Sequence, residues 1–196
     1  MAAHQGADAP DTFLRAVASL RRAELRPEVV LAEAPAPQRL APYAVAFTAE
    51  VAAPGGGDDL ATGRLVLLHD PGGHEAWHGT LRLVTFVRAD LEPELAADPL
   101  LAGVGWTWLV EALEQQGAEA TAVSGTVTRV ASESFGALAD RPATAEVEVR
   151  ASWTPLGEDL APHLQGWVQL LCTAAGLPPL PAGVVPIPAR RTARGR

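Results

Sequence analysis

The sequence predicts an α+β fold, in which an antiparallel sheet of about six strands carries helices on one face. Two groups of segments alternate apolar and polar residues as half-buried strands do, and helix-like apolar stripes precede, separate and follow them. The expected order of elements is α-β-β-β-β-α-β-β-α. Because helices and strands do not alternate one by one, a doubly wound parallel sheet is excluded. At 196 residues the chain is long enough for a single domain with a proper core.

The first elements are predicted to be a helix and two strands. Asp11 or Thr12 is expected to cap a helix over residues 12–25, which ends because the next residue precedes a proline and is disfavoured in the α region. A short strand over residues 29–31 follows. A proline-rich path then leads to a second strand over residues 43–51, whose apolar residues recur with a period of two.

Residues 64–68 and 80–89 are predicted to be interior strands. The first segment is nearly all apolar and too short for a helix, and the second carries apolar side chains on both faces. The loop between them contains three of the five histidines. We expect this pair of strands to form the centre of the sheet.

The second half of the chain is predicted to contain a helix, two strands and a closing helix. The first helix covers residues 99–116 and begins with a proline. Strands are expected over residues 121–130 and 145–153, the second with one apolar and one polar face. The closing helix covers residues 157–176 and ends at a glycine followed by two prolines.

The helix over residues 99–116 is expected to lie against the sheet. Asp98 is the predicted N-cap, and the two interior glycines Gly103 and Gly105 indicate close contact with the strands. The residues expected to face inward are Leu101, Val104, Trp108, Leu109 and Ala112.

The single domain is expected to span residues 11–177. Residues 1–10 are small, polar and unpatterned, so they are predicted to be disordered. Residues 178–196 form a tail that is first proline-rich and then arginine-rich, and this tail is predicted to be a disordered extension. A glycine-rich turn over residues 53–59 is expected to be mobile.

Composition and charge exclude several classes of protein. All fifteen basic residues are arginine, and four of them lie in residues 190–196, so the net charge of −8 leaves a strongly acidic body that repels a phosphate backbone. Nucleic-acid binding by the domain is therefore not expected. No apolar run is long enough to span a membrane, and the first residues lack the pattern of a secretion signal. We expect a cytoplasmic protein.

The loop between the interior strands carries the side chains best suited to chemistry. His74, Glu75 and His78 match H-E-x-x-H, in which two histidines one helical turn apart bind zinc and the glutamate activates the bound water. That geometry requires a helix. Here Pro-Gly-Gly precedes the motif and a glycine and a strand follow it, so we expect a loop or a single turn.

Two metal-site alternatives and one simpler interpretation remain for this loop. A zinc hydrolase would take a third ligand from Glu92, Glu94 or Asp98. A metal site unrelated to peptidases would use His69, Asp70, His74 and His78. In the simpler interpretation the loop is a surface turn whose aspartate and histidines bond the local backbone. We expect this last arrangement, with no metal and no cofactor.

Other catalytic patterns are absent from the sequence, and two tryptophans are candidates for a partner surface. The nucleophile elbow, the dinucleotide fingerprint and the phosphate loop do not occur. Cys172, the only cysteine, lies in an apolar helical run and is expected to be a core residue. Trp77 in the histidine loop and Trp106, off the inward stripe of its helix, are candidate interface residues.

Several phrases of the sequence resemble one protein family. They are RLAPYA, GRLVLLHDPGGHEAWHGTLRLVTFVRADLEPELAADPLL, SGTVTR, EVRASWTP and LLCTAAGLPP, and together they resemble the actinobacterial domain-of-unknown-function family numbered three thousand, across roughly residues 11–180. This resemblance implies no activity, cofactor or catalytic residue. The order of elements is also similar to the sheet-plus-helices plan of type III secretion chaperones and their bacterial relatives, a likeness of fold that does not define function.

These observations favour a non-enzymatic cytoplasmic module that binds another protein, as a chaperone or adaptor does, with a homodimer as one expected form. The alternative is a metal-dependent hydrolase at the loop from His69 to His78. A second alternative is weak RNA association through the arginines of residues 190–196.

Overall fold

The computed structural model describes residues 9–53 and 57–178. The predictions of disorder in the N-terminal segment and in the tail fall mainly outside these residues, and RNA association through the tail arginines falls wholly outside them. Residues 54–56 of the glycine-rich turn that was expected to be mobile also lie outside the described residues. Within the described part of the chain, no helix has the length and apolar character needed to span a bilayer.

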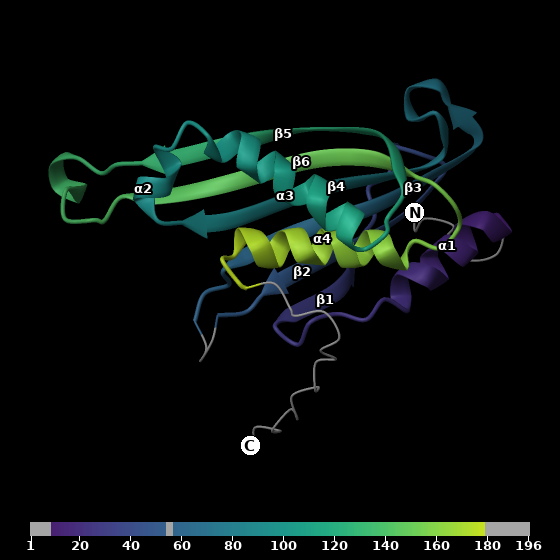
Figure 1. The fold of residues 1–196 in the computed structure, drawn as a ribbon, viewed down its shortest axis with the longest axis horizontal. Coiled ribbons are helices and arrows are strands. Elements are labelled where there is room, and N and C mark those ends of the chain that lie inside the picture. Colours follow the sequence, from purple (N-terminus) through teal and green to yellow (C-terminus); the bar gives the residue numbers. More distant parts are fainter. Residues whose placement is uncertain (1–8, 54–56, 179–196) are drawn as a thin grey trace, which may run out of the picture.

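One antiparallel sheet of six strands forms the centre of the fold (Figure 1). The strands are β1 (Val29–Ala34), β2 (Tyr43–Val51), β3 (Ala61–His74), β4 (Gly79–Leu91), β5 (Ala120–Ser132) and β6 (Thr144–Pro155). Their order across the sheet is β1-β2-β3-β4-β6-β5, so β3 and β4 lie at the centre, as predicted, and β1 and β5 form the edges. The predicted α+β class and antiparallel sheet are confirmed.

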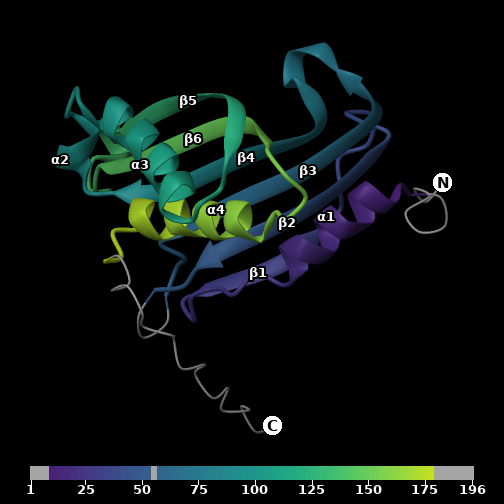
Figure 2. The same cartoon turned by 45° about the vertical axis from the view of Figure 1, so that its right-hand side comes forward.

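The longer helices all lie on one face of this sheet (Figure 2). The helices are α1 (Asp11–Arg21), α2 (Pro93–Ala96), α3 (Leu101–Gln115) and α4 (Ala161–Ala174), and single 3-10 turns occur at η1 (Glu75–Trp77) and η2 (Gly136–Leu138). α4 packs over β2, β3 and β4, while α3 packs on α4 and over β5. Among the described residues, the opposite face of the sheet carries none of the longer helices.

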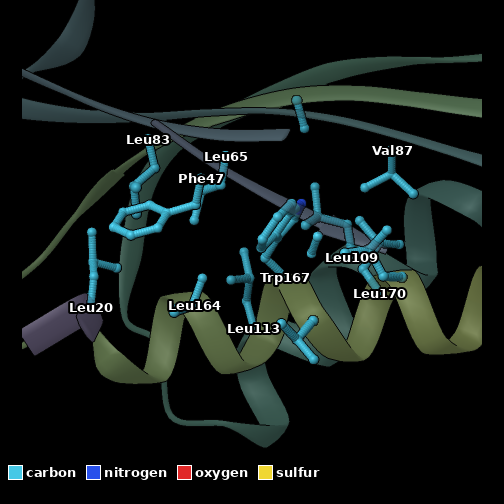
Figure 3. Close-up of a cluster of buried hydrophobic side chains, with 14 of the residues drawn as sticks. Leu20, Phe47, Leu65, Leu83, Val87, Leu109, Leu113, Leu164, Trp167 and Leu170 are labelled. Atoms are coloured by element: carbon cyan, nitrogen blue, oxygen red, sulfur yellow. The ribbon is translucent and has the colours of Figure 1, made fainter. Parts of the chain in front are cut away.

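The core lies between the sheet and the helices, and Figure 3 shows part of it. Successive strand residues point to opposite faces, so every second residue of a strand faces the helices. In β3 and β4 these residues include Leu65, Leu67, Leu83 and Val87, which are buried in the same core cluster as Trp167 of α4. A glycine at position 63 belongs to the same face of β3.

Several element boundaries differ from those predicted. α1 begins after Pro10 without a side-chain cap and ends at Arg21, four residues before the predicted end, because the Arg22 N–H bonds back to Ser19 in a tighter final turn. The acidic connector contains the short helix α2, which Pro93 begins. Asp98 accepts a bond from the Leu100 N–H and so caps the turn before α3.

The prediction for the face of α3 is partly wrong. Val104 is exposed, although it was expected to face inward. A Cβ added to Gly103 would meet no atom within 4 Å, whereas one added to Gly105 would lie 3.1 Å from Val127 Cγ1. Only Gly105 is therefore needed for the close contact between α3 and the sheet.

Gly63 determines how closely α4 approaches the sheet. A Cβ at this position would lie 2.9 Å from Leu171 Cδ2 and 2.9 Å from Trp167 Cζ2. We expect Gly63→Ala to lower the free energy of unfolding by about 1–3 kcal/mol, because the helix must shift to admit the methyl group. The matched variant Gly103→Ala should raise it by about 0.5–1 kcal/mol through helix propensity. Urea unfolding followed by tryptophan fluorescence measures both, and equal effects would contradict this account of the packing.

His163 is buried in α4 in its neutral form. Trp153 Nε1 donates a hydrogen bond to His163 Nδ1 at 3.2 Å, so the proton of the neutral ring lies on Nε2. Burial lowers the pKa of His163 from its ordinary 6.5 to about 4. The unfolded chain therefore binds a proton, between these two pH values, that the folded protein does not bind.

The folded protein should consequently lose stability as the pH falls from about 6.5 towards about 4, by on the order of 3 kcal/mol from this residue. We expect His163→Gln to remove this part of the pH dependence, because no buried imidazole remains to be protonated. Urea unfolding at several pH values measures it. The control His78→Gln changes an exposed histidine and should keep the slope of the wild type, and a His163→Gln variant that also kept it would refute the assignment.

Candidate functional site

The face of the sheet without helices, here called the open face, carries the even-numbered residues of β2, β3, β4 and β6. On part of this face Ala46, Val66 and Leu68 form a second apolar cluster, which is buried under other residues. Trp77 from the hairpin after β3 packs on this cluster, as do alanines from the segment between β1 and β2. The remainder of the open face, over β4, β6 and β5, is not covered in this way.

An open groove of about 460 Å³ begins at Arg64 and Val66 of β3, at the border of this cluster, and extends over β4, β6 and β5. Its lining residues are Arg64, Val66, Val84, Thr85, Phe86, Ser124, Gly125, Thr126, Arg150, Ala151 and Ser152. The pairing of the strands arranges the side chains in two rows across the sheet. One row contains Arg64, Phe86, Arg150 and Thr126, and the next contains Val66, Val84, Ser152 and Ser124.

The two rows give the groove an apolar floor and a hydroxyl-lined side. Val66, Val84 and Phe86 come from the central strands, whereas the hydroxyl groups come from β5 and β6. The Arg150 guanidinium lies over the Phe86 ring, 4.9 Å from its centroid, and also pairs with Glu148 at 2.7 Å. An aromatic and aliphatic floor beside polar groups can hold a ligand of mixed character.

Arg82 is a buried cation that lies two residues before Val84 on β4, next to the row that contains Val84, Ser152 and Ser124. Its side chain is only 6% exposed, although it lies on the open face of the central strand β4. Nη1 donates to Thr154 Oγ1 at 3.1 Å, while Nη2 donates to Ser152 Oγ at 2.7 Å and to Ser124 Oγ at 3.3 Å. Desolvation lowers the pKa of this guanidinium from its ordinary value.

No carboxylate pairs with Arg82 in the part of the chain that the structure describes. Its three partners among the described residues are neutral hydroxyl groups, which accept three hydrogen bonds from the guanidinium but leave its positive charge uncompensated. A buried ion without a counterion costs several kcal/mol even after the protein relaxes. A buried charge with this uncompensated desolvation cost is more typical of a functional site than of a region selected for stability.

A β-bulge in β5 supplies one of these hydroxyl groups. The register shifts between Thr121 and Ser124, where β5 contains one residue more than its partner, and Ala122 adopts a positive φ of 50°. Without this extra residue, Val123 would lie opposite Ser152. The bulge instead places Ser124 opposite Ser152, so that both hydroxyl groups reach Arg82.

The H-E-x-x-H motif lies in a β-hairpin that projects beyond the rest of the sheet (Figures 1 and 2). η1 is a single 3-10 turn between β3 and β4, and His78 has a left-handed φ of 57°. The expected turn is therefore present, and the helix on which a zinc peptidase depends is not formed by these residues.

The four candidate metal ligands lie in different surroundings. His69 is buried on the helix side, stacked on Phe13, with its Nδ1 3.0 Å from the Thr80 carbonyl oxygen. Asp70 Oδ1 accepts a bond from the Gly72 N–H at 2.9 Å. His74 and His78 are exposed at the end of the hairpin. No three His, Cys, Asp or Glu side chains among the described residues are placed to hold a metal ion.

The candidate interface tryptophans are both half-buried. The Trp77 ring stacks on His74 at a centroid distance of 5.0 Å, and Trp106 lies over Gly125 of β5, in contact with the core. Their role in binding a partner remains a prediction. Phe135 in the turn between β5 and β6 is far more exposed, at 76%, and the periodicity of the sequence did not single it out.

Cys172 is a core residue, as predicted. It is buried in α4, and burial raises the pKa of its thiol to about 11. The thiolate needed for nucleophilic chemistry is therefore scarce at neutral pH.

Sequence reasoning did not identify Arg82. The sequence nevertheless contained an indication of its importance. An arginine in the middle of a strand predicted to be interior must either have a hydrogen-bonding or charged partner or serve a function that requires its charge. Its partners were not visible in the sequence, since they lie 42 to 72 residues away along the chain.

The hairpin geometry leads to a prediction about metal content. Protein purified after incubation with Zn²⁺ and dialysis should contain less than one zinc ion per chain, and His74→Ala should leave that content unchanged, because His69 is buried away from the two exposed histidines. Mass spectrometry of the metal content measures this. One zinc ion per chain that disappears in His74→Ala would instead support the metal-dependent alternative.

The sequence of this chain matches one known protein family. The family model described as "Protein of unknown function (DUF3000)" matches residues 9–185. Searches of curated proteins and of solved structures found no match. Because the family model covers most of the chain, the protein belongs to the DUF3000 family.

Proposed function

We propose that this chain is a non-enzymatic cytoplasmic protein-binding module, of the chaperone or adaptor kind, which holds an extended segment of a partner protein in the groove on its open face. An actinobacterial source is part of the same proposal. The observation that carries it is the groove of about 460 Å³, with an apolar floor and a hydroxyl-lined side. Surfaces of this mixed kind are typical of sites for peptides and other ligands.

The shape of the groove favours an extended chain. Val84 and Phe86 are two residues apart on β4, and an extended peptide repeats its side chains at the same interval. A bound peptide can therefore place alternate apolar side chains on the floor. A homodimer belongs to the same proposal, with the edge strand β5 as the surface on which a second copy would pair.

The two alternatives have less support. A zinc hydrolase of the H-E-x-x-H kind would need its two histidines on a helix. A metal site unrelated to peptidases would need His69, which is buried, whereas His74 and His78 are exposed at the end of the hairpin. RNA association would use residues 190–196, which lie outside the described residues.

Photo-crosslinking tests the proposal. We expect a photoreactive amino acid at Thr126, which is exposed and lines the groove, to form adducts with one short segment of a partner protein in a native lysate. The same amino acid at Glu111, exposed on α3, is the matched control and should not form them. A synthetic peptide of that segment should bind the purified protein, and Val84→Arg should weaken its binding at least tenfold by filling the floor.

Identical adducts from Thr126 and Glu111, or a peptide that binds the Val84→Arg variant as well as the wild type, would contradict a site in the groove. The thermal unfolding midpoint of each variant shows whether it remains folded.

A further inference from the structure

We propose that Ser124 Oγ and Ser152 Oγ, held by Arg82, form an anion-binding subsite at one end of the groove, and that it receives a carboxylate of the bound peptide. The inference rests on the proposed function and adds the chemical class of the partner segment, which carries a carboxylate. The carboxylate belongs either to an Asp or Glu side chain of the partner or to its C-terminus.

The hydrogen bonds of the two serines leave their protons available for a ligand. Each hydroxyl oxygen accepts a bond from Arg82 Nη2, and an oxygen that accepts this bond still has its own O–H to donate. Neither Ser124 nor Ser152 donates to an acceptor within the described residues. Thr154 differs, because its Oγ1 donates to the Trp77 carbonyl oxygen and its proton is already used.

The positive charge behind the serines determines which ligand they prefer. Arg82 is buried and has no carboxylate partner among the described residues, so the potential at its two serine partners is positive. Both serines line the groove. A carboxylate that accepts from two hydroxyl groups in front of a buried guanidinium receives hydrogen bonds and a compensating charge at the same place.

The surroundings of the subsite define the rest of the ligand. Val66 and Val84 lie in the same row as the two serines, and Phe86 lies in the next row. At that row Arg64 donates to the Pro35 carbonyl oxygen and has no carboxylate partner in the described part of the chain. The preferred peptide therefore combines apolar side chains with a carboxylate at the Arg82 end.

Binding of short peptides tests this subsite. The first probe is a dye-labelled apolar pentapeptide with blocked ends and one central aspartate, and its partner probe has asparagine instead. A third probe is an apolar pentapeptide with a free C-terminal carboxylate, compared with its amide. We expect one of the two carboxylate probes to bind at least tenfold more tightly than its uncharged counterpart in fluorescence anisotropy, and the pair that differs identifies the source of the carboxylate.

Variants assign the preference to Arg82. Arg82→Met, which keeps the length of the stem and removes the charge, should reduce the tenfold ratio to about one, whereas Arg82→Lys should retain part of it. The matched control Arg88→Met removes an arginine from the same strand and face that is paired with Glu146, and the ratio should remain tenfold. If Arg82→Met does not fold, the double variant Ser124→Ala/Ser152→Ala keeps the charge and should still lower the ratio several-fold.

Each other outcome would overturn the subsite. Equal binding of the charged and uncharged probes, or a ratio that survives in Arg82→Met, would assign Arg82 a purely structural role. If the charged and uncharged probes bind equally and millimolar inorganic phosphate at constant ionic strength also displaces them, the two serines hold phosphate, which equally overturns the carboxylate subsite. These failures are distinguishable from failure of the proposed function, because crosslinking from Thr126 to a partner segment does not require that segment to be acidic.

Discussion

The contact between α4 and the sheet at Gly63 is the constraint on which the rest of the structure depends. Because this residue has no side chain, Trp167 and Leu171 pack directly on the backbone of β3. Both side chains are fully buried, and the other large residues of the core are arranged around them. α4 in turn supports α3, which reaches the sheet at β5 through Gly105.

Placing the longer helices on one face has a direct consequence for the other. An antiparallel sheet can leave one face to solvent, and here that face is neither fully polar nor fully covered. The segment between β1 and β2 and the Trp77 hairpin protect the side over β2 and β3. Over β4, β6 and β5 the apolar side chains Val84 and Phe86 are only half-buried beside hydroxyl groups and arginines, and this combination makes the region a surface suited to a ligand.

Arg82 is the residue whose presence stability alone does not explain. A strand at the centre of a sheet would be more stable with an apolar residue there, because the partners of the desolvated guanidinium within the described part of the chain are all hydroxyl groups. Natural sequences depart from local rules of this kind mainly at functional sites. The bulge and the positive φ of Ala122 add a second departure at the same place, and it is this bulge that brings Ser124 to Arg82.

The sequence by itself determined the class of the fold, the order of its strands and longer helices and the turn between β3 and β4, because period-two alternation, prolines and glycines act within a few residues. It also predicted the burial of Cys172 from its place in an apolar helical run. It misplaced the end of α1 and the face of Val104, since the ends and faces of helices depend on what packs against them. Only the tertiary structure decided that Arg82 meets Ser124, Ser152 and Thr154 and that Gly63 lies beneath α4. These contacts join residues far apart in the chain, and no local pattern records which strands become neighbours.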